Sequence, residues 1–201
     1  HFVLSQVEYT KNLIEKYEAE TGRTIKPKRA IPSYTEEAPP APEEILKFKE
    51  PSFGRKWAGA LMYPSRGTRV DLAHPTCRIA RRVTRWTDRD TQKLDDIVGY
   101  LKFHSDLTVN YRITNRTQQY ELHIYSDSDH ASAEDRISHS GVVILLVDGD
   151  GNKNMIHWVS KRQKSVSLSS TEAEICALVD ACRAADEVID ACFALDIAIK
   201  T

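Results

Sequence analysis

Four carboxylates form the pattern in this sequence that is most suited to chemistry. Asp127 and Asp129 form one pair, and Glu172 and Glu174 form a second pair much later in the chain. Carboxylate oxygens are the ligands that hard cations such as Mg²⁺ prefer. Two such cations, about 4 Å apart, can activate a water and stabilise the leaving oxygen when a phosphodiester is hydrolysed. The fold, rather than local spacing, must bring the two pairs together for this chemistry.

A long helix is expected to carry the glutamate pair. Ser169 followed by Glu172 fits a capping box, and Thr171 followed by Glu174 fits it again. With Glu172 as the natural cap partner, Glu174 is left for another role, since residues two apart point to different sides of a helix. The apolar positions that follow at helical spacing predict the face that packs on the core: Ile175, Leu178, Val179, Cys182, Ala185, Val188, Ile189, Cys192 and Phe193.

Three strands are expected upstream of this helix. Residues 122–126 alternate in character and lead into the aspartate pair. Residues 140–147 and 154–160 are also predicted strands, and the Asp-Gly-Asp-Gly turn between them is typical of a hairpin. The predicted order is therefore three strands and a helix, with acid at the end of the first strand and the start of the helix.

Three motifs in this half resemble the ribonuclease H domain of copia-type (Pseudoviridae) retrotransposon Gag-Pol polyproteins. In that family the first strand ends in Tyr-Ser-Asp-x-Asp, which matches residues 125–129. The family's Trp-x-Ser-Lys-x-Gln turn and Leu-Ser-Ser-Thr-Glu-Ala-Glu segment match residues 158–163 and 168–174. The resemblance implies an α/β fold of mixed α+β type, an incomplete ribonuclease H-like domain with a three-stranded antiparallel sheet and a long helix.

The resemblance also assigns roles to the carboxylates. Asp127 matches the family's first catalytic aspartate and Glu174 its catalytic glutamate, and both would be ligands of a two-metal Mg²⁺ site. Asp129 is a candidate secondary ligand, or a turn residue at the strand end. In the family, the strand after the long helix carries another catalytic aspartate and pairs beside the first strand. That strand would follow Thr201, so we expect an incomplete metal site and an open sheet edge available for pairing.

Two basic groups are candidate contacts for an RNA–DNA hybrid or another nucleic acid. Four arginines flank the apolar stripe of a helix predicted after residue 71, and the guanidinium fork suits phosphate. A basic turn follows the third strand, next to the predicted site. Solvated surfaces are the alternative interpretation of both groups. The two groups are Arg78, Arg81, Arg82 and Arg85, and Lys161, Arg162 and Lys164.

The N-terminal half resembles the part of the polyprotein that precedes the nuclease. Leu4-Ser-Gln6 with Tyr9 resembles a segment that follows the polymerase palm, so residues 1–23 are interpreted as the end of the reverse transcriptase. The paired aspartates of the polymerase would lie before His1, so no polymerase active site is expected here.

The remaining boundaries follow from composition and periodicity. Prolines make residues 24–51 a predicted linker. Residues 52–118 are predicted to be a helical connection region, whose last helix covers residues 87–102 and begins at Thr87 or Asp88. Residues 119–201 are predicted to form the truncated ribonuclease H-like domain.

Composition bears on the partners and the location that are expected for the protein. The chain has 201 residues with 28 Lys and Arg against 29 Asp and Glu, so nucleic-acid binding would need local patches rather than global charge. The four cysteines lack metal-ligand spacing, which favours reduced thiols and an intracellular location, cytoplasmic or nuclear. The apolar runs are too short to span a bilayer, so no membrane partner is expected.

Three functions remain open at this point. The leading prediction is a polyprotein fragment whose ancestral activity is magnesium-dependent endonucleolytic cleavage of RNA in RNA–DNA hybrids. The alternatives are a catalytically dead remnant that binds nucleic acid and a transposon relic without function. Cleavage assays and salt-dependent binding separate the three.

Overall fold

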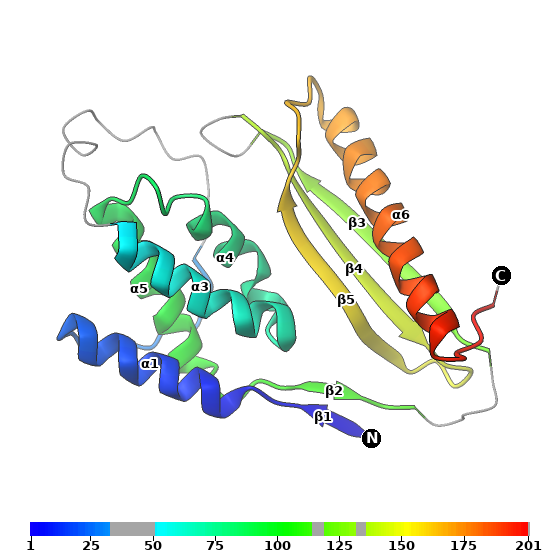
Figure 1. Ribbon diagram of the computed structural model, residues 1–201, viewed down its shortest axis with the longest axis horizontal. Helices are drawn as coiled ribbons and strands as arrows, with labels where there is room; N and C mark the ends of the chain where they lie inside the picture. Colours follow the sequence, from blue (N-terminus) through cyan, green and yellow to red (C-terminus); the bar gives the residue numbers. More distant parts are fainter. Residues whose placement is uncertain (33–50, 114–118, 132–135, 201) are drawn as a thin grey trace. The chain divides into compact units, whose positions relative to one another are not determined.

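The computed structural model describes residues 1–32, 51–113, 119–131 and 136–200 (Figure 1). The chain divides into two compact units. The helical unit is Leu4–Val109, and the sheet unit is His1–Val3 with Asn110–Thr201. Most of the predicted proline-rich linker lies outside the described residues. Of its described part, residues 24–32 contain no helix or strand, whereas its last residue, Pro51, begins the helix α3.

The helical unit consists of four helices and a short 3₁₀ turn within its described residues. Two short strands, which pair with each other, lie where the chain passes between the units. In chain order these elements are β1 (Phe2–Leu4), α1 (Val7–Thr21), α3 (Pro51–Gly67), η1 (Val70–Leu72), α4 (Ala73–Ala80), α5 (Asp88–Phe103) and β2 (Val109–Tyr111).

Apolar residues at helical spacing form the core of the helical unit. Four such residues of α5 are buried, as are three of the four in the stripe that follows residue 71, and Val83 packs partly against the same core. The indole Nε1 of Trp86 donates to Thr91 Oγ1 at 3.0 Å, so this large side chain is buried without an unsatisfied N–H. The buried stripe residues are Leu72, Ile79, Trp86, Leu94, Ile97, Val98 and Leu101.

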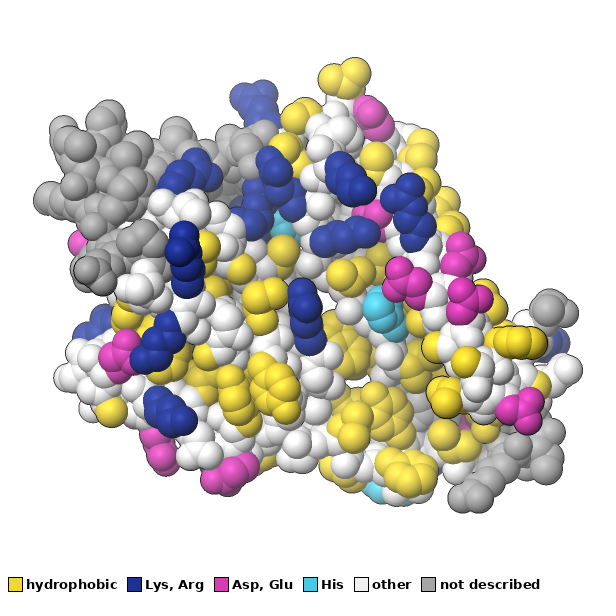
Figure 2. Space-filling model, in the orientation of Figure 1, with side chains coloured by type: hydrophobic (Ala, Val, Ile, Leu, Met, Phe, Trp, Pro, Cys, Tyr) yellow, Lys and Arg dark blue, Asp and Glu magenta, His cyan; other side chains and the backbone are white. Residues whose placement is uncertain are grey.

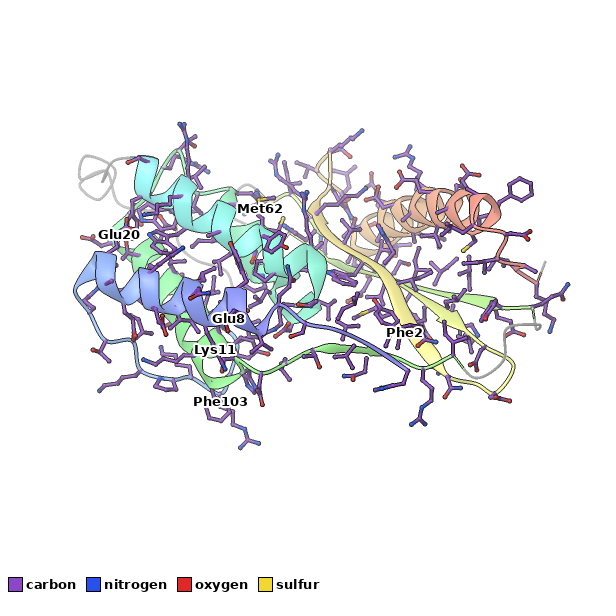
Figure 3. The ribbon with its side chains drawn as sticks, turned by 60° about the horizontal axis from the view of Figure 1, so that its bottom comes forward. Phe2, Glu8, Lys11, Glu20, Met62 and Phe103 are labelled. Carbon is purple, nitrogen blue, oxygen red and sulfur yellow. The ribbon has the colours of Figure 1, made fainter. Side chains whose placement is uncertain are left out.

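Polar contacts fix the ends and the surface of these helices. Thr87 caps α5 in a reciprocal capping box with Asp90, which confirms the first of the two predicted caps. On the surface, Lys56 of α3 forms an ion pair with Glu20 near the end of α1. Figure 3 shows the labelled Glu20 on α1, and Phe103 at the end of α5, where its ring is half-exposed. The helix α3 itself was not predicted from the sequence.

A glycine in α5 permits a close backbone approach. The Lys28 backbone N–H donates to the Gly99 carbonyl at 2.9 Å. A Cβ atom at position 99 would lie 2.7 Å from the Lys26 carbonyl oxygen, a backbone atom that has little freedom to move. At Gly59, inside α3, an added Cβ would meet no atom within 4 Å.

The same chemical change is therefore expected to have opposite effects at these two positions. Gly99→Ala should lower the free energy of unfolding by about 1–3 kcal/mol, because the methyl group overpacks against the backbone. Gly59→Ala should raise it by about 0.5–1 kcal/mol, because alanine loses less conformational entropy in a helix. Urea unfolding followed by circular dichroism measures both values, and equal shifts in the two variants would contradict this close approach.

The sheet unit confirms the predicted mixed α/β fold. Three antiparallel strands form a sheet in the order β3-β4-β5, and α6 lies across one face of it (Figure 1). The turn at Asp148 joins two strands, and its side chain accepts hydrogen bonds from the backbone N–H groups of Asp150 and Asn152. The elements are β3 (Glu121–Asp129), β4 (His139–Val147), β5 (Lys153–Arg162) and α6 (Ser170–Ala194).

The face of α6 that packs on the sheet differs from the predicted one. The predicted stripe is wrong at most of its large residues: Leu178 is 56% exposed and Phe193 is 88% exposed. Alanines instead form the buried face, because small side chains let a helix approach a sheet closely. Figure 2 shows hydrophobic side chains at the surface along α6, mixed with acidic ones. The buried residues of α6 are Ala173, Ala177, Ala181, Ala184, Ala185 and Cys192.

The edge of the sheet at β3 is partly occupied. After α6 the chain turns back, and Ile199 forms a parallel bridge with Tyr120, just before β3 begins. The Tyr120 N–H donates to the Ala198 carbonyl, and the Lys200 N–H donates to the Tyr120 carbonyl, both at 2.8 Å. Among the described residues, β4 is the only strand paired along β3 itself. Pairing of this edge with a partner stays a prediction.

Candidate active site

The start of α6 separates the roles of its two glutamates. The hydroxyl of Ser169 accepts a hydrogen bond from the Glu172 backbone N–H at 3.1 Å, so Ser169 is the N-cap. The Glu172 carboxylate accepts from the Leu168 backbone N–H at 2.7 Å, one residue before the cap. Glu172 therefore serves the helix start. Ser169 is the N-cap that the first of the two predicted capping boxes requires, but the return bond from the carboxylate goes to Leu168 instead of to Ser169.

Glu174 contacts the strand that carries the aspartates. Its Oε1 accepts a hydrogen bond from the hydroxyl of Ser128 at 2.8 Å. Ser128 lies between Asp127 and Asp129, so the fold brings the helix motif to the strand motif. The Glu174 side chain is exposed, which leaves its carboxylate accessible to solvent.

Alternation along β3 places Asp127 on the other face of the strand. The strand pairs with β4 without a register shift from Glu121 to Asp129. Leu122 packs in the core beneath α6, and Ser128 is on the same face because side chains of a strand alternate. Asp127 and Asp129 therefore share the opposite face. The structure brings Glu174 to the residue next to Asp127 and places the two carboxylates on either side of strand β3.

The donor atoms of this site are all oxygens. Asp127, Glu174 and the Ser128 hydroxyl are oxygen donors of the kind that a hard cation prefers. Within the part of the chain that the structure describes, no group of three or more His, Cys, Asp and Glu side chains is arranged to hold a metal ion. The chemistry of these donor atoms suits a hard cation such as Mg²⁺, which commonly keeps several waters as ligands.

Gln163, which the sequence indicated only as part of a motif, is buried beside the start of α6. Its Nε2 donates to Ser140 Oγ at 3.2 Å and to the Ala173 carbonyl at 2.8 Å. Its Oε1 accepts from the Ser167 hydroxyl at 3.0 Å. The amide thus joins β4, the loop after β5 and the first turn of α6.

The arginines predicted to contact nucleic acid differ in their burial and in their hydrogen-bond partners. In the helical unit, α4 ends at Ala80, earlier than predicted, so Arg82 and Arg85 lie in the turn that follows it. Arg82 Nε donates to the buried Asp90 at 2.8 Å, so Arg82 has a structural role, whereas Arg85 is exposed. Arg78 of α4 and Arg81 just after it are half-buried.

The basic turn after β5, in the sheet unit, also contains both a cation in an ion pair with α6 and cations that are exposed. Lys161 forms an ion pair with Asp180 of α6 at 2.9 Å. The side chains of Arg162 and Lys164 are exposed. The exposed side chains of Arg162 and Lys164 are better placed than the half-buried Lys161 to meet a phosphate, so they are the stronger candidates in this turn.

Arg69 is a buried charged residue that sequence reasoning did not single out. Its guanidinium binds both carboxylate oxygens of Asp71, with 2.7 Å between Nη2 and Oδ2, and donates to the His104 carbonyl at 2.9 Å. Burial raises the pKa of Asp71, but the bonds from Arg69 and its positive charge outweigh burial, so the pKa lies below its ordinary value. The spacing of arginine and aspartate two residues apart was the available signal.

The described helices include none that is long and apolar enough to cross a bilayer.

The chain is similar to the retrovirus-related Pol polyproteins from two Arabidopsis thaliana transposons. It is 31% identical to the RE2 polyprotein over 176 residues and 30% identical to the RE1 polyprotein over 177 residues. Each match covers 85% of this chain but 11% of the polyprotein, so the chain spans about a tenth of these relatives.

A shorter relative is matched over most of its own length. The chain is 36% identical over 124 residues to Secreted RxLR effector protein 161 of Plasmopara viticola, a match that covers 61% of this chain and 82% of that protein. No protein-family model matches the chain.

Proposed function

We propose a nuclease function for this chain, which is related to the retrovirus-related Pol polyproteins of transposons and belongs to one family with the Plasmopara viticola protein. The sheet unit would be a ribonuclease H-like module that cleaves the RNA strand of an RNA–DNA hybrid. The observation that carries the proposal is the hydrogen bond between Ser128 and Glu174, which joins the two acidic motifs. Residues 1–23 would be the end of the reverse transcriptase of such a polyprotein.

A divalent cation such as Mg²⁺ would be held by Asp127 and Glu174, with Asp129 as a further ligand. When bound, Mg²⁺ lowers the pKa of water and stabilises the charge that develops on phosphate oxygens. Asp127 and Glu174 lie on opposite faces of β3, so one of the two side chains would have to turn around the edge of the strand for both to hold the same cation. Ser128 would hold Glu174 on its side.

The hybrid would be held by exposed basic side chains. Lys164 and Arg162 are exposed next to the start of α6, and Arg85 is exposed in the helical unit. Contacts of this kind bind phosphates without reading sequence, so binding would weaken as salt rises.

The four cysteines, all of them among the described residues, form no disulfide, which supports an intracellular setting.

Asp127→Asn and Glu174→Gln are each expected to lower cleavage of a labelled RNA–DNA hybrid by at least about 100-fold. Each change removes a charged ligand and with it several kcal/mol of transition-state stabilisation. The measurement is single-turnover cleavage with and without Mg²⁺. Hybrid binding, followed by gel shift at several salt concentrations, should stay within about twofold, because neither carboxylate attracts phosphate.

The matched control is Asp190→Asn, an exposed acid on the same helix that should leave cleavage unchanged. Cleavage that persists in Asp127→Asn would show that the assigned site is wrong. Salt-dependent binding without cleavage in the unmodified chain would favour the non-catalytic remnant. Neither binding nor cleavage would favour the relic.

A further inference from the structure

The side chain of Gln163 is a buried amide that forms hydrogen bonds with three different segments of the chain. It is 4% exposed and follows the last residue of β5. Both N–H groups of its amide donate, one to Ser140 of β4 and one to the Ala173 carbonyl of α6. Its oxygen accepts from Ser167 in the intervening loop. Its backbone N–H also donates to the Ser138 carbonyl at 2.9 Å, which fixes the residue itself.

The segment that Gln163 holds is the one that presents Glu174. Ala173, whose carbonyl accepts the 2.8 Å bond, is fully buried and immediately precedes Glu174. The Glu174 carboxylate in turn meets the Ser128 hydroxyl of β3. A chain of contacts therefore runs from β4 through Gln163 to the first turn of α6, and from there to the strand that carries Asp127.

We propose that Gln163 is a positioning residue for Glu174, an inference that rests on the proposed nuclease function. The amide fixes where the first turn of α6 sits on the sheet, and this sets the position of the carboxylate. Cation ligands must be held within a fraction of an ångström, so a residue that orients a ligand affects metal binding almost as a ligand does.

Gln163→Glu tests the donor function with little change of size. The carboxylate can still accept from Ser167, but when ionised it has no hydrogen to donate to Ser140 or to the Ala173 carbonyl. The first turn of α6 then loses its bond to the sheet. Asn154→Asp is the matched control in the same unit: Asn154 is also a buried amide, which donates to the Arg112 carbonyl at 2.9 Å and accepts from the Arg112 N–H at 2.7 Å.

The first measurement is amide hydrogen exchange over residues 174–178 of the whole chain. We expect exchange there to be at least about tenfold faster in Gln163→Glu than in Asn154→Asp, because local opening of this turn becomes easier. Ser167→Ala, which removes only the bond to the Gln163 oxygen, should give a smaller increase in the same direction. It provides the test if Gln163→Glu fails to fold. Equal exchange in Asn154→Asp and in the variant tested would overturn the inference.

The second measurement is the Mg²⁺ dependence of hybrid cleavage. The Mg²⁺ concentration for half-maximal cleavage should rise about tenfold or more in Gln163→Glu and stay unchanged in Asn154→Asp. An unchanged Mg²⁺ dependence in Gln163→Glu would overturn the positioning role while leaving the nuclease intact. If the unmodified chain does not cleave, the proposed function fails, and the exchange experiment still decides whether Gln163 holds the turn.

Discussion

Replacing Arg69 with leucine is expected to lower the free energy of unfolding by about 3–5 kcal/mol. Arg69 is 1% exposed, and its guanidinium satisfies both the Asp71 carboxylate and the His104 carbonyl. Leucine fills much of the space but leaves Asp71 as a partly buried charge without this partner. Breaking one side of a buried ion pair is costly for this reason. Urea unfolding at pH 7 measures the effect.

An exposed ion pair of the same unit supplies the control. Lys56→Met removes the partner of Glu20 at the surface, and the free energy of unfolding should change by no more than about 1 kcal/mol, as is usual for solvated pairs. A loss in Arg69→Leu as small as that in Lys56→Met would show that the buried pair has no special role in stability.

The ion pair between Arg69 and Asp71 also predicts that its contribution to the free energy of unfolding depends on pH. The pKa of Asp71 is lower in the folded protein than in the unfolded chain, so the unfolded chain binds the proton more readily. This contribution is fully present above the unfolded pKa of about 3.9 and is lost as the pH falls through the folded value. Arg69→Leu should therefore weaken the loss of stability below pH 4.

Enlarging a small residue of α6 is expected to do more damage than removing a large one. Ala181→Leu should lower the free energy of unfolding by about 1–3 kcal/mol, because Ala181 is 1% exposed and packs directly against the sheet with Val142 and Ile144. Leu178→Ser should change it by about 0.5 kcal/mol or less, since Leu178 is largely exposed. Thermal or urea unfolding of both variants gives the comparison.

A hydrophobicity pattern read from the sequence makes the opposite prediction, so the two variants separate the two accounts. If Leu178→Ser unfolds far more easily than Ala181→Leu, the large apolar stripe is the packed face and the arrangement described for α6 is wrong. Val188 offers a further check, because it belongs to the predicted stripe and packs partly against the core. The loss in free energy of unfolding for Val188→Ser should lie between those for Leu178→Ser and Ala181→Leu.

Much of the fold could be predicted because local rules and tertiary packing agree. The hairpin turn at Asp148, the caps at Thr87 and Ser169 and the stripe of α5 all form as their residue types indicate. The stripe of α6 could not be predicted, because alanine is compatible with either face. The distance of the helix from the sheet decides which face is buried, and that distance is a tertiary property.

The candidate site was predictable to a similar degree. The division of labour between Glu172 and Glu174 follows from helix geometry alone. Strand alternation also places Asp127 and Ser128 on opposite faces, but which face meets α6 depends on the packing of the whole strand. The role of Gln163 depends on three segments that meet only in the folded chain, so residue type gave no sign of it.

The bridge between Tyr120 and Ile199 has a consequence for the order of folding. The strands β3, β4 and β5 pair with sequence neighbours, so they close short loops at small entropic cost and can form early. The bridge closes a loop that contains all three strands and α6, and only a few backbone bonds compensate for it. The bridge should therefore form last during refolding and open first, before the whole sheet unit unfolds.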